Sequence, residues 1–162
     1  MKAYTILVIE DDFLNRRHIK KTLEPHFNII EASNSYEAYN AIKTQLFNIA
    51  IIDINLGDDA EEEGIIIGDT LNNEYGIPFI YLTAYETIDI TTKAFQTAPK
   101  SYITKPFKET DLLMSVNIAI QQSETLQTQK TLTVKEDFYY TKILIESIDY
   151  IESDGNYILI SS

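Results

Sequence analysis

The sequence contains no cysteine and few basic residues. Without cysteine, disulfide bonds and thiolate chemistry are excluded, which agrees with a reducing compartment, so we expect a cytoplasmic protein. The 13 lysines and arginines are outnumbered by 25 aspartates and glutamates, giving a formal net charge of −12. Such an acidic chain repels nucleic acids and anionic membranes, so we do not expect these residues to bind DNA by themselves.

Long hydrophobic runs and internal repeats are also missing. No apolar run has the length of a membrane span, and an apolar strand pattern begins close to the first residue. We therefore expect neither a signal peptide nor a membrane span. Apolar residues still make up 44% of the 162 residues, which is enough for the core of one domain with a short additional piece.

Five short apolar runs, rich in β-branched residues, alternate with helix patterns in the first part of the chain. Runs without polar alternation predict strands that are buried on both faces, and their alternation with helices predicts parallel βαβ units. We therefore predict an α/β fold, a doubly wound five-stranded parallel sheet, with a short β-rich C-terminal tail. The runs cover residues 3–9, 27–32, 49–54, 78–83 and 101–104.

The helix patterns predict which side chains face the core. The first helix begins near Phe13 and is closed by Pro25, and the second has Ser35 as its N-cap. The positions that recur at helical spacing and are predicted to face the core are Leu14, His18 or Ile19, Leu23, Tyr36, Tyr39, Ile42, Leu46, Ile90, Ala94, Phe95, Leu112, Leu113, Val116, Ile120 and Leu126.

Polar side chains follow four of the predicted strands at the points where these strands end. Glu10 and Asp11 follow the first strand, Asp53 the third, Thr83 the fourth and Lys105 the fifth. Asp53 alone is equally compatible with starting a turn or capping the next helix. Because the carboxyl ends of parallel strands share one edge of the sheet, where ligands bind, we expect these five side chains to form a site.

Three carboxylates at one edge would repel one another. Two unit charges about 4 Å apart cost on the order of 4 kcal/mol at an effective dielectric of about 20, so without compensation some acids would stay protonated. A divalent cation relieves this repulsion, and oxygen ligands favour Mg²⁺. With Mg²⁺ and Lys105 the formal charges cancel, so we predict a magnesium site suited to phosphoryl transfer onto Asp53.

Four motifs at these strand ends resemble the signature set of the response-regulator receiver domain of two-component systems. The resemblance covers about residues 3–121 and implies a flavodoxin-like sheet with strand order 2-1-3-4-5, an order that spacing alone does not give. It also implies a phosphoacceptor switch, not an enzyme that acts on other substrates. The motifs are Val8–Asp12, Ile52–Leu56, Tyr81–Ala84 and Tyr102–Phe107.

The resemblance implies specific roles for the acidic residues. Asp53 would be the phosphoacceptor and would receive its phosphoryl group from a sensor histidine kinase. Asp11 and Asp53 would bind Mg²⁺ directly, together with the backbone carbonyl of Asn55. Glu10 would act on the metal mostly through water. An aspartate-nucleophile phosphatase would need a second acid at the position of Asn55, which disfavours that third hypothesis.

The resemblance implies a switch in the other residues. Thr83 would move to bond the phosphoryl group, and Tyr102 would swing inward behind it. Lys105 would pair with the phosphoryl oxygens, and the Lys105–Pro106 peptide bond would be cis. Ala84 is small and would leave access to the site. The face formed by the fourth helix, fifth strand and fifth helix would then favour a homodimer.

Two segments depart from the family pattern. The loop 58–63 is unusually acidic and lacks the proline that is common in the family after the aspartate. We interpret this loop as a solvated surface; the alternative is that it biases metal affinity or partner choice. Residues 98–100, Ala-Pro-Lys, replace a common Gly-Ala pair, so the turn into the fifth strand is expected to differ.

The last part of the chain has a different pattern. After a receiver domain at 1–121, residues 122–130 are predicted to extend the last helix or form a linker, and residues 131–162 to form three short strands with a hairpin turn at 154–156. This segment resembles the start of a LytTR-type DNA-binding domain. Residues 122–162 contain three lysines and seven acids, so they have no basic footprint.

Two outputs remain open from the sequence. The first is control of transcription by a longer regulator that continues past Ser162, with DNA bound only through a C-terminal domain largely absent from this chain. The second is a stand-alone receiver that passes on phosphoryl groups as an adaptor. A short natural protein fits the second.

Overall fold

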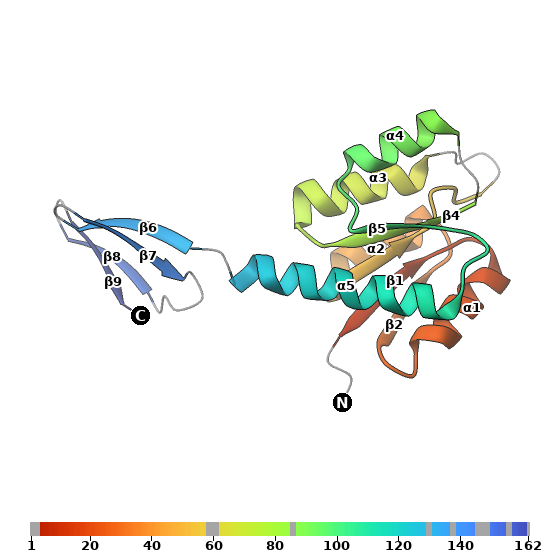
Figure 1. Cartoon of the computed structure of the whole chain (residues 1–162), viewed down its shortest axis with the longest axis horizontal. Coiled ribbons are helices and arrows are strands. Elements are labelled where there is room, and N and C mark those ends of the chain that lie inside the picture. The colour runs from red at the N-terminus through yellow and green to blue at the C-terminus, as the bar shows by residue number, and fades with distance from the viewer. Residues whose placement is uncertain are drawn as a thin grey trace. The chain divides into compact units, whose positions relative to one another are not determined.

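The computed structural model describes residues 4–57, 62–84, 87–128, 131–136, 139–144, 150–154 and 157–161 (Figure 1). The chain divides into two compact units, Met1–Ile120 and Gln121–Ser162. In the described part of the chain, no helix is both long and apolar enough to cross a membrane.

The first unit is built on a five-stranded parallel sheet with the order β2-β1-β3-β4-β5. This confirms the predicted doubly wound sheet and the order 2-1-3-4-5. β1 is buried from Ile6 to Ile9 and β3 over its whole length, and their buried residues are isoleucine, leucine, valine and one alanine, as expected for strands covered on both faces. The strands are β1 (Thr5–Ile9), β2 (Asn28–Ala32), β3 (Ile49–Ile52), β4 (Phe79–Thr83) and β5 (Ser101–Thr104).

Helices cover both faces of this sheet (Figure 1). Ile6 and Val8 of β1 point toward α1 and α5, whereas Leu7 and Ile9 point toward α2, α3 and α4, because successive strand residues face opposite sides. A π-helical turn, η1 (Leu71–Tyr75), continues α3 and ends at Gly76. The helices are α1 (Phe13–Leu23), α2 (Ser35–Thr44), α3 (Glu63–Thr70), α4 (Ile88–Gln96) and α5 (Glu109–Thr128).

Several predicted core positions are wrong. Leu14, Tyr36 and Leu46 are 72%, 83% and 95% exposed, and Phe95 is 58% exposed. The helix α2 instead buries two alanines and Ile42, because small side chains let the helix lie close to the sheet. The prediction from the spacing of large apolar residues therefore assigned the wrong side chains of this helix to the core. The other predicted core residues of α1, α4 and α5 up to Ile120 are buried or partly buried, with Ile19 rather than His18 facing the core.

The N-cap of α2 also differs from the prediction. Asn34, not Ser35, caps the helix, and its side-chain oxygen accepts a hydrogen bond from the backbone N–H of Glu37 at 2.9 Å. The Glu37 carboxylate in turn accepts hydrogen bonds from the N–H and hydroxyl of Ser33. Two adjacent residues with cap-forming side chains made the boundary ambiguous by one residue.

The second unit contains two antiparallel hairpins. β6 (Thr131–Glu136) pairs with β7 (Tyr139–Leu144), and β8 (Tyr150–Asp154) pairs with β9 (Tyr157–Ser161). The prediction of three strands is therefore wrong, because the apolar spacing from Ile143 to Ile151 was assigned to one strand, whereas β7 ends at Leu144 and β8 begins at Tyr150. Asp154 lies opposite Tyr157, in the register expected of a hairpin, while residues 155–156 and the side chain of Leu126 fall outside the described part.

Candidate functional site

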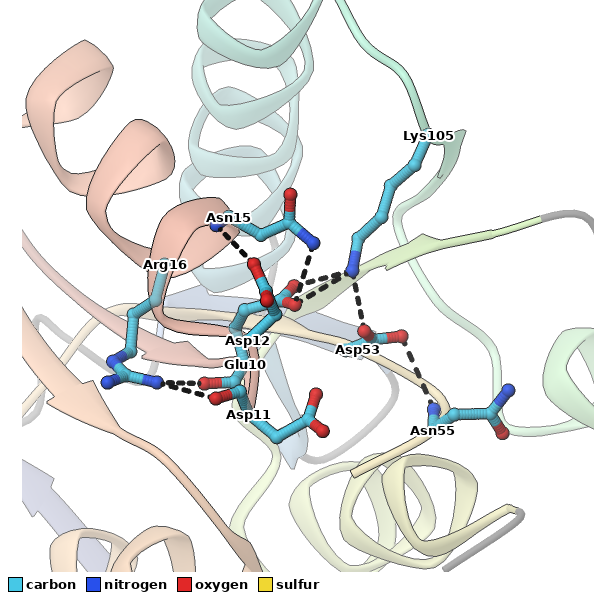
Figure 2. A network of polar contacts seen from close by, with 8 residues as sticks. All are labelled: Glu10, Asp11, Asp12, Asn15, Arg16, Asp53, Asn55 and Lys105. Carbon is cyan, nitrogen blue, oxygen red and sulfur yellow. Dashed lines mark hydrogen bonds and ion pairs between the residues drawn. The ribbon is translucent and has the colours of Figure 1, made fainter. Parts of the chain in front are cut away.

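Lys105 joins the ends of two neighbouring strands of the sheet. Its Nζ donates hydrogen bonds to Glu10 Oε1 and Oε2 at 2.9 and 2.7 Å, and to Asp53 Oδ2 at 2.6 Å (Figure 2). Glu10 follows β1 and Asp53 follows β3, which pair in parallel, so both acids reach the same edge. The sheet thus brings together three residues that are up to 95 positions apart in the chain.

Asp11 completes an acidic cluster at this edge. Glu10, Asp11 and Asp53 each offer one carboxylate oxygen, and these three oxygens lie within 4.8 Å of one another. Glu10 and Asp53 are 1% and 7% exposed, whereas Asp11 is exposed. The predicted convergence of the three acids and Lys105 is therefore observed.

Burial dominates the electrostatics of the cluster. The pKa of Glu10 is raised to about 7, chiefly by burial; the hydrogen bond from Lys105 lowers this pKa and the neighbouring Asp53 raises it, so that burial dominates. Burial also raises the pKa of Asp53, again against the effect of Lys105. One ammonium group thus only partly compensates these acids. The site therefore favours the binding of an additional cation.

The pKa of Lys105 follows from the same contacts. Burial alone would lower its pKa, but the hydrogen bonds to Asp53 and Glu10 outweigh this effect and the pKa is raised. Lys105 therefore stays protonated at neutral pH and is a permanent cation beside Asp53. Its peptide bond to Pro106 is cis, as the resemblance implied.

Three residues that the sequence analysis did not select hold the turn between β1 and α1. Asp12 caps α1, and its Oδ1 accepts a hydrogen bond from the N–H of Asn15 at 2.7 Å. Asn15 Nδ2 donates to Glu10 Oε1 at 3.3 Å, and Arg16 Nη1 donates to the carbonyl of Glu10 at 2.6 Å (Figure 2). An aspartate immediately before the first residue of a predicted helix is an N-cap signal that could have identified Asp12. No sequence signal distinguished Arg16 from a solvated cation.

The turn after β3 holds Asp53 from the other side. The N–H of Asn55 donates to Asp53 Oδ1 at 3.3 Å, and the N–H of Gly64 donates to the carbonyl of Ile54 at 2.9 Å. A side chain at Gly64 would collide with the backbone oxygen of Asp53 and would lie 2.6 Å from Ile54 Cα. Only glycine lets α3 begin so close to Asp53, and this close approach fixes its backbone.

The remaining predicted residues lie on the strands beside Lys105. Thr83 is fully buried at the end of β4, and its backbone carbonyl accepts a hydrogen bond from the N–H of Lys105 at 2.7 Å. Tyr102 is half-buried, with its ring stacked on Phe95 at 5.5 Å. Ala84 is exposed.

The donor set fits a magnesium ion. The cluster offers carboxylate oxygens from two neighbouring strand ends, and no nitrogen or sulfur ligand is included. Hard divalent cations bind such oxygen ligands, and the partly compensated charge of the buried acids favours a cation here. Glu10, Asp11 and Asp53 are the residues that could hold it.

A family model identifies the chain. The model described as "Response regulator receiver domain" matches residues 6–117, which run from β1 through β5 into the first part of α5. The chain therefore belongs to the response-regulator receiver domain family. In this family an acidic triad of this kind is typical of a Mg²⁺-binding site, and receiver domains are phosphorylated by histidine kinases.

Similar proteins agree with this assignment. The "Heme response regulator HssR" of Staphylococcus saprophyticus is 28% identical over 119 residues, covering 73% of this chain and 52% of that protein. The "Probable transcriptional regulatory protein SilR" of Salmonella typhimurium is 30% identical over 132 residues, covering 81% and 57%. The chain thus spans about half the length of the curated relatives it matches.

Solved structures share the fold. The receiver domain protein (CheY-like) from Methanospirillum hungatei aligns with a TM-score of 0.70 at 25% identity, covering 76% of this chain and 98% of that one. The BeF3-activated DrrB receiver domain aligns with a TM-score of 0.65 at 21% identity over 73% of this chain and 97% of that one, which shows the fold alone.

Proposed function

We propose that this chain is the receiver part of a two-component response regulator and accepts a phosphoryl group on Asp53 from the phosphohistidine of a sensor kinase. The observation that carries the proposal is the position of Asp53. In a member of the receiver family, its carboxylate lies 2.6 Å from the ammonium of Lys105 and beside two further acids at the carboxyl edge of the sheet.

Exposure and bonding favour Asp53 over Glu10 as the nucleophile. Both oxygens of Glu10 are engaged by Lys105, and Glu10 is 1% exposed, so an attack from Glu10 would have to break these bonds. The side chain of Asp53 is 9% exposed and accepts one hydrogen bond on each oxygen. Lys105 opposes the effect of burial on the pKa of Asp53 and so favours the ionised carboxylate, which is a stronger nucleophile than the protonated acid.

The transfer is a simple displacement at phosphorus. A carboxylate oxygen of Asp53 forms the new O–P bond, and the P–N bond to the imidazole of the kinase breaks. The imidazole nitrogen keeps the bonding electron pair and takes up a proton. Lys105 is already in place to neutralise charge on the phosphoryl oxygens.

Magnesium would complete the charge balance. Asp11 and Asp53, with the backbone carbonyl of Asn55, would bind the ion directly, and Glu10 would act through water. When bound, the ion supplies electrostatic stabilisation of the phosphoryl oxygens. The support from this chain is the grouping of three carboxylate oxygens within 4.8 Å.

Phosphorylation would be read out at the β5 edge of the sheet. Thr83 would bond the phosphoryl group, Tyr102 would move behind it, and Ala84 would leave room for access. The stacking of Tyr102 on Phe95 of α4 connects β5 to that helix. We propose that the face of α4, β5 and α5 forms a homodimer; exposed apolar side chains on it support this: Ile88, Phe95, Met114 and Ile118.

The output is proposed to be control of transcription. SilR is named a probable transcriptional regulatory protein, and the hairpins β6–β9 are compatible with the start of a LytTR-type DNA-binding domain. The family match ends at residue 117, so the LytTR proposal depends on the sequence pattern of residues 131–162. A phosphotransfer adaptor without DNA output is the alternative. A gene that continues past Ser162 into a basic segment would favour transcription.

Phosphorylation of Asp53 can be tested with a small phosphodonor. Phosphoramidate with Mg²⁺ should add one phosphoryl group to the protein by intact mass, and Asp53→Asn should abolish the addition. Asp89→Asn, at an exposed aspartate of α4, is the matched control and should be labelled like the unmodified protein. Equal labelling of the Asp53→Asn protein would overturn the proposal.

A further inference from the structure

Arg16 binds the backbone of the turn that carries two of the acids. Its Nη1 donates to the carbonyl oxygen of Glu10 at 2.6 Å and to that of Asp11 at 3.1 Å (Figure 2). Both carbonyls belong to residues of the acidic cluster. A single guanidinium nitrogen thus fixes two successive peptide groups just where the chain leaves β1.

The guanidinium is itself held from two other directions. Its Nε lies 4.0 Å from Glu31 Oε1 of the neighbouring strand β2, and its Cζ lies 5.9 Å from the centre of the Phe13 ring. Glu31 is also paired with Lys20 at 2.6 Å. The Arg16 side chain is 15% exposed, so this is a packed cation, unlike its exposed neighbour Arg17.

The two acids differ in what holds their side chains. Glu10 is fixed by Lys105 and Asn15 through its carboxylate. The described contact of Asp11 is through its backbone carbonyl, to Arg16. The direction of the exposed Asp11 carboxylate therefore depends on the peptide orientation that Arg16 imposes.

We infer that Arg16 is a positioning residue for the metal site, and that it holds the Glu10–Asp11 backbone so that the Asp11 carboxylate points at Asp53. The inference rests on the proposed function in one respect, namely that the acidic cluster binds Mg²⁺. Arg16 would thus orient two of the proposed metal ligands through their backbone carbonyls without binding the metal itself.

The positive charge of Arg16 allows a positioning role to be distinguished from a purely electrostatic one. A cation beside a Mg²⁺ site repels the ion, so if Arg16 acted only through its charge, its removal would strengthen Mg²⁺ binding. If Arg16 positions the acids, its removal weakens Mg²⁺ binding despite the lost repulsion. The two explanations predict opposite signs.

The test measures the Mg²⁺ dissociation constant directly, by calorimetric titration with MgCl₂ at a temperature where every variant is folded. Arg16→Met is compared with Arg17→Met, which removes the same charge one residue away and touches neither carbonyl. We expect about tenfold weaker binding for Arg16→Met, in the range seen when groups that orient metal ligands are removed. Arg17→Met is expected to bind as tightly as the unmodified protein or more tightly.

A second pair of variants keeps the charge. Arg16→Lys and Arg17→Lys both remain cationic, but a lysine at 16 cannot reproduce the flat guanidinium contact to two carbonyls. Arg16→Lys is expected to bind Mg²⁺ several-fold more weakly than Arg17→Lys. This pair decides the question if Arg16→Met does not fold. Saturating Mg²⁺ should restore phosphoramidate labelling of the Arg16 variants to the unmodified rate.

The outcomes separate this inference from the proposed function. Weaker Mg²⁺ binding in the Arg16 variant than in its Arg17 counterpart supports positioning. Equal or tighter binding overturns it, while the proposed function stands. If the unmodified protein itself binds no Mg²⁺, the metal site of the proposed function fails and the inference fails with it.

Discussion

The two sides of the site differ in how firmly they are held. On the α1 side, Ile19 and Leu23 are fully buried, and the turn before the helix is tied by side chains of Asp12, Asn15 and Arg16. On the α4 side, Ala94 is the buried residue of the helix, while Ile88 and Phe95 are 88% and 58% exposed. Few buried apolar contacts mean a low cost of local rearrangement.

This difference suggests a division of labour. Metal and phosphoryl chemistry needs carboxylates that stay in place, and the α1 side supplies them. A signal needs an element whose position can change at small cost, and α4 has the weaker attachment. Substitutions in the tightly held part of the site should therefore cost more stability than substitutions that weaken the attachment of α4.

The largest loss of stability is expected from Gly64→Ala, because Gly64 lies against the backbone of Asp53 and Ile54. The new methyl group would collide with the backbone of Asp53 and Ile54, which cannot rotate away. We expect a loss of more than about 3 kcal/mol in the free energy of unfolding, above the usual cost of overpacking. Urea unfolding measures it.

Gly68→Ala is the control for this prediction. The methyl group there would meet the side chains of Tyr81 and Phe79, which can shift more easily than backbone. A smaller loss than for Gly64→Ala is expected. If both variants lose the same stability, the close approach of α3 to Asp53 does not have the special role described here.

The second effect is a stability profile that runs opposite to that of an ordinary carboxylate. Burial raises the pKa of Glu10 from 4.5 to about 7, so between these values the folded protein binds more protons than the unfolded chain. The metal-free stability should therefore fall as pH rises through this window, by on the order of 2–3 kcal/mol from this group. Urea unfolding at a series of pH values measures it.

Mg²⁺ should remove much of this loss. The ion binds the deprotonated acids, so its stabilising effect should grow with pH over the same window. Glu10→Gln should flatten the metal-free profile. A metal-free profile that rises with pH from about 5 to about 7 in the unmodified protein, and is unchanged in Glu10→Gln, would contradict the burial of charge described for this site.

The smallest effect is expected from Tyr81→Phe on the α4 side. The Tyr81 hydroxyl and Thr97 Oγ1 form a buried hydrogen bond of 2.8 Å, which ties β4 to the end of α4. Its loss should cost about 1 kcal/mol. Hydrogen exchange should accelerate in α4 and stay unchanged in α1. Equal acceleration in both helices would mean that the two sides are not independent.

Much of the fold and site could be predicted from sequence because it depends on one-dimensional patterns. Buried strands are continuous apolar runs, and the polar residue after each strand must lie at the carboxyl edge, so Glu10, Asp53 and Lys105 could be placed together. The order of the strands came from the family resemblance, since the pattern of runs does not specify it.

The parts that could not be predicted depend on three-dimensional contacts. Arg16 looked like a solvated helix cation because nothing local shows that its side chain returns to the carbonyls of Glu10 and Asp11. Tyr36 was predicted to be a core residue because it is large and stands at helical spacing from other apolar residues, but its side chain is exposed. Ala98 adopts a φ of 57°, in the left-handed region that favours glycine, and nothing in the sequence pattern indicated that an alanine would take this conformation. The expected difference between this turn and that of the family stays a prediction.

The most direct test of the central claim locates the phosphoryl group among the neighbouring acids. After labelling with phosphoramidate and Mg²⁺, borohydride reduction converts an aspartyl phosphate to homoserine, which peptide mass spectrometry can assign to one position. The account predicts conversion at Asp53, with Glu10, Asp11 and Asp12 unchanged. Conversion at any of those three residues with Asp53 intact would contradict it.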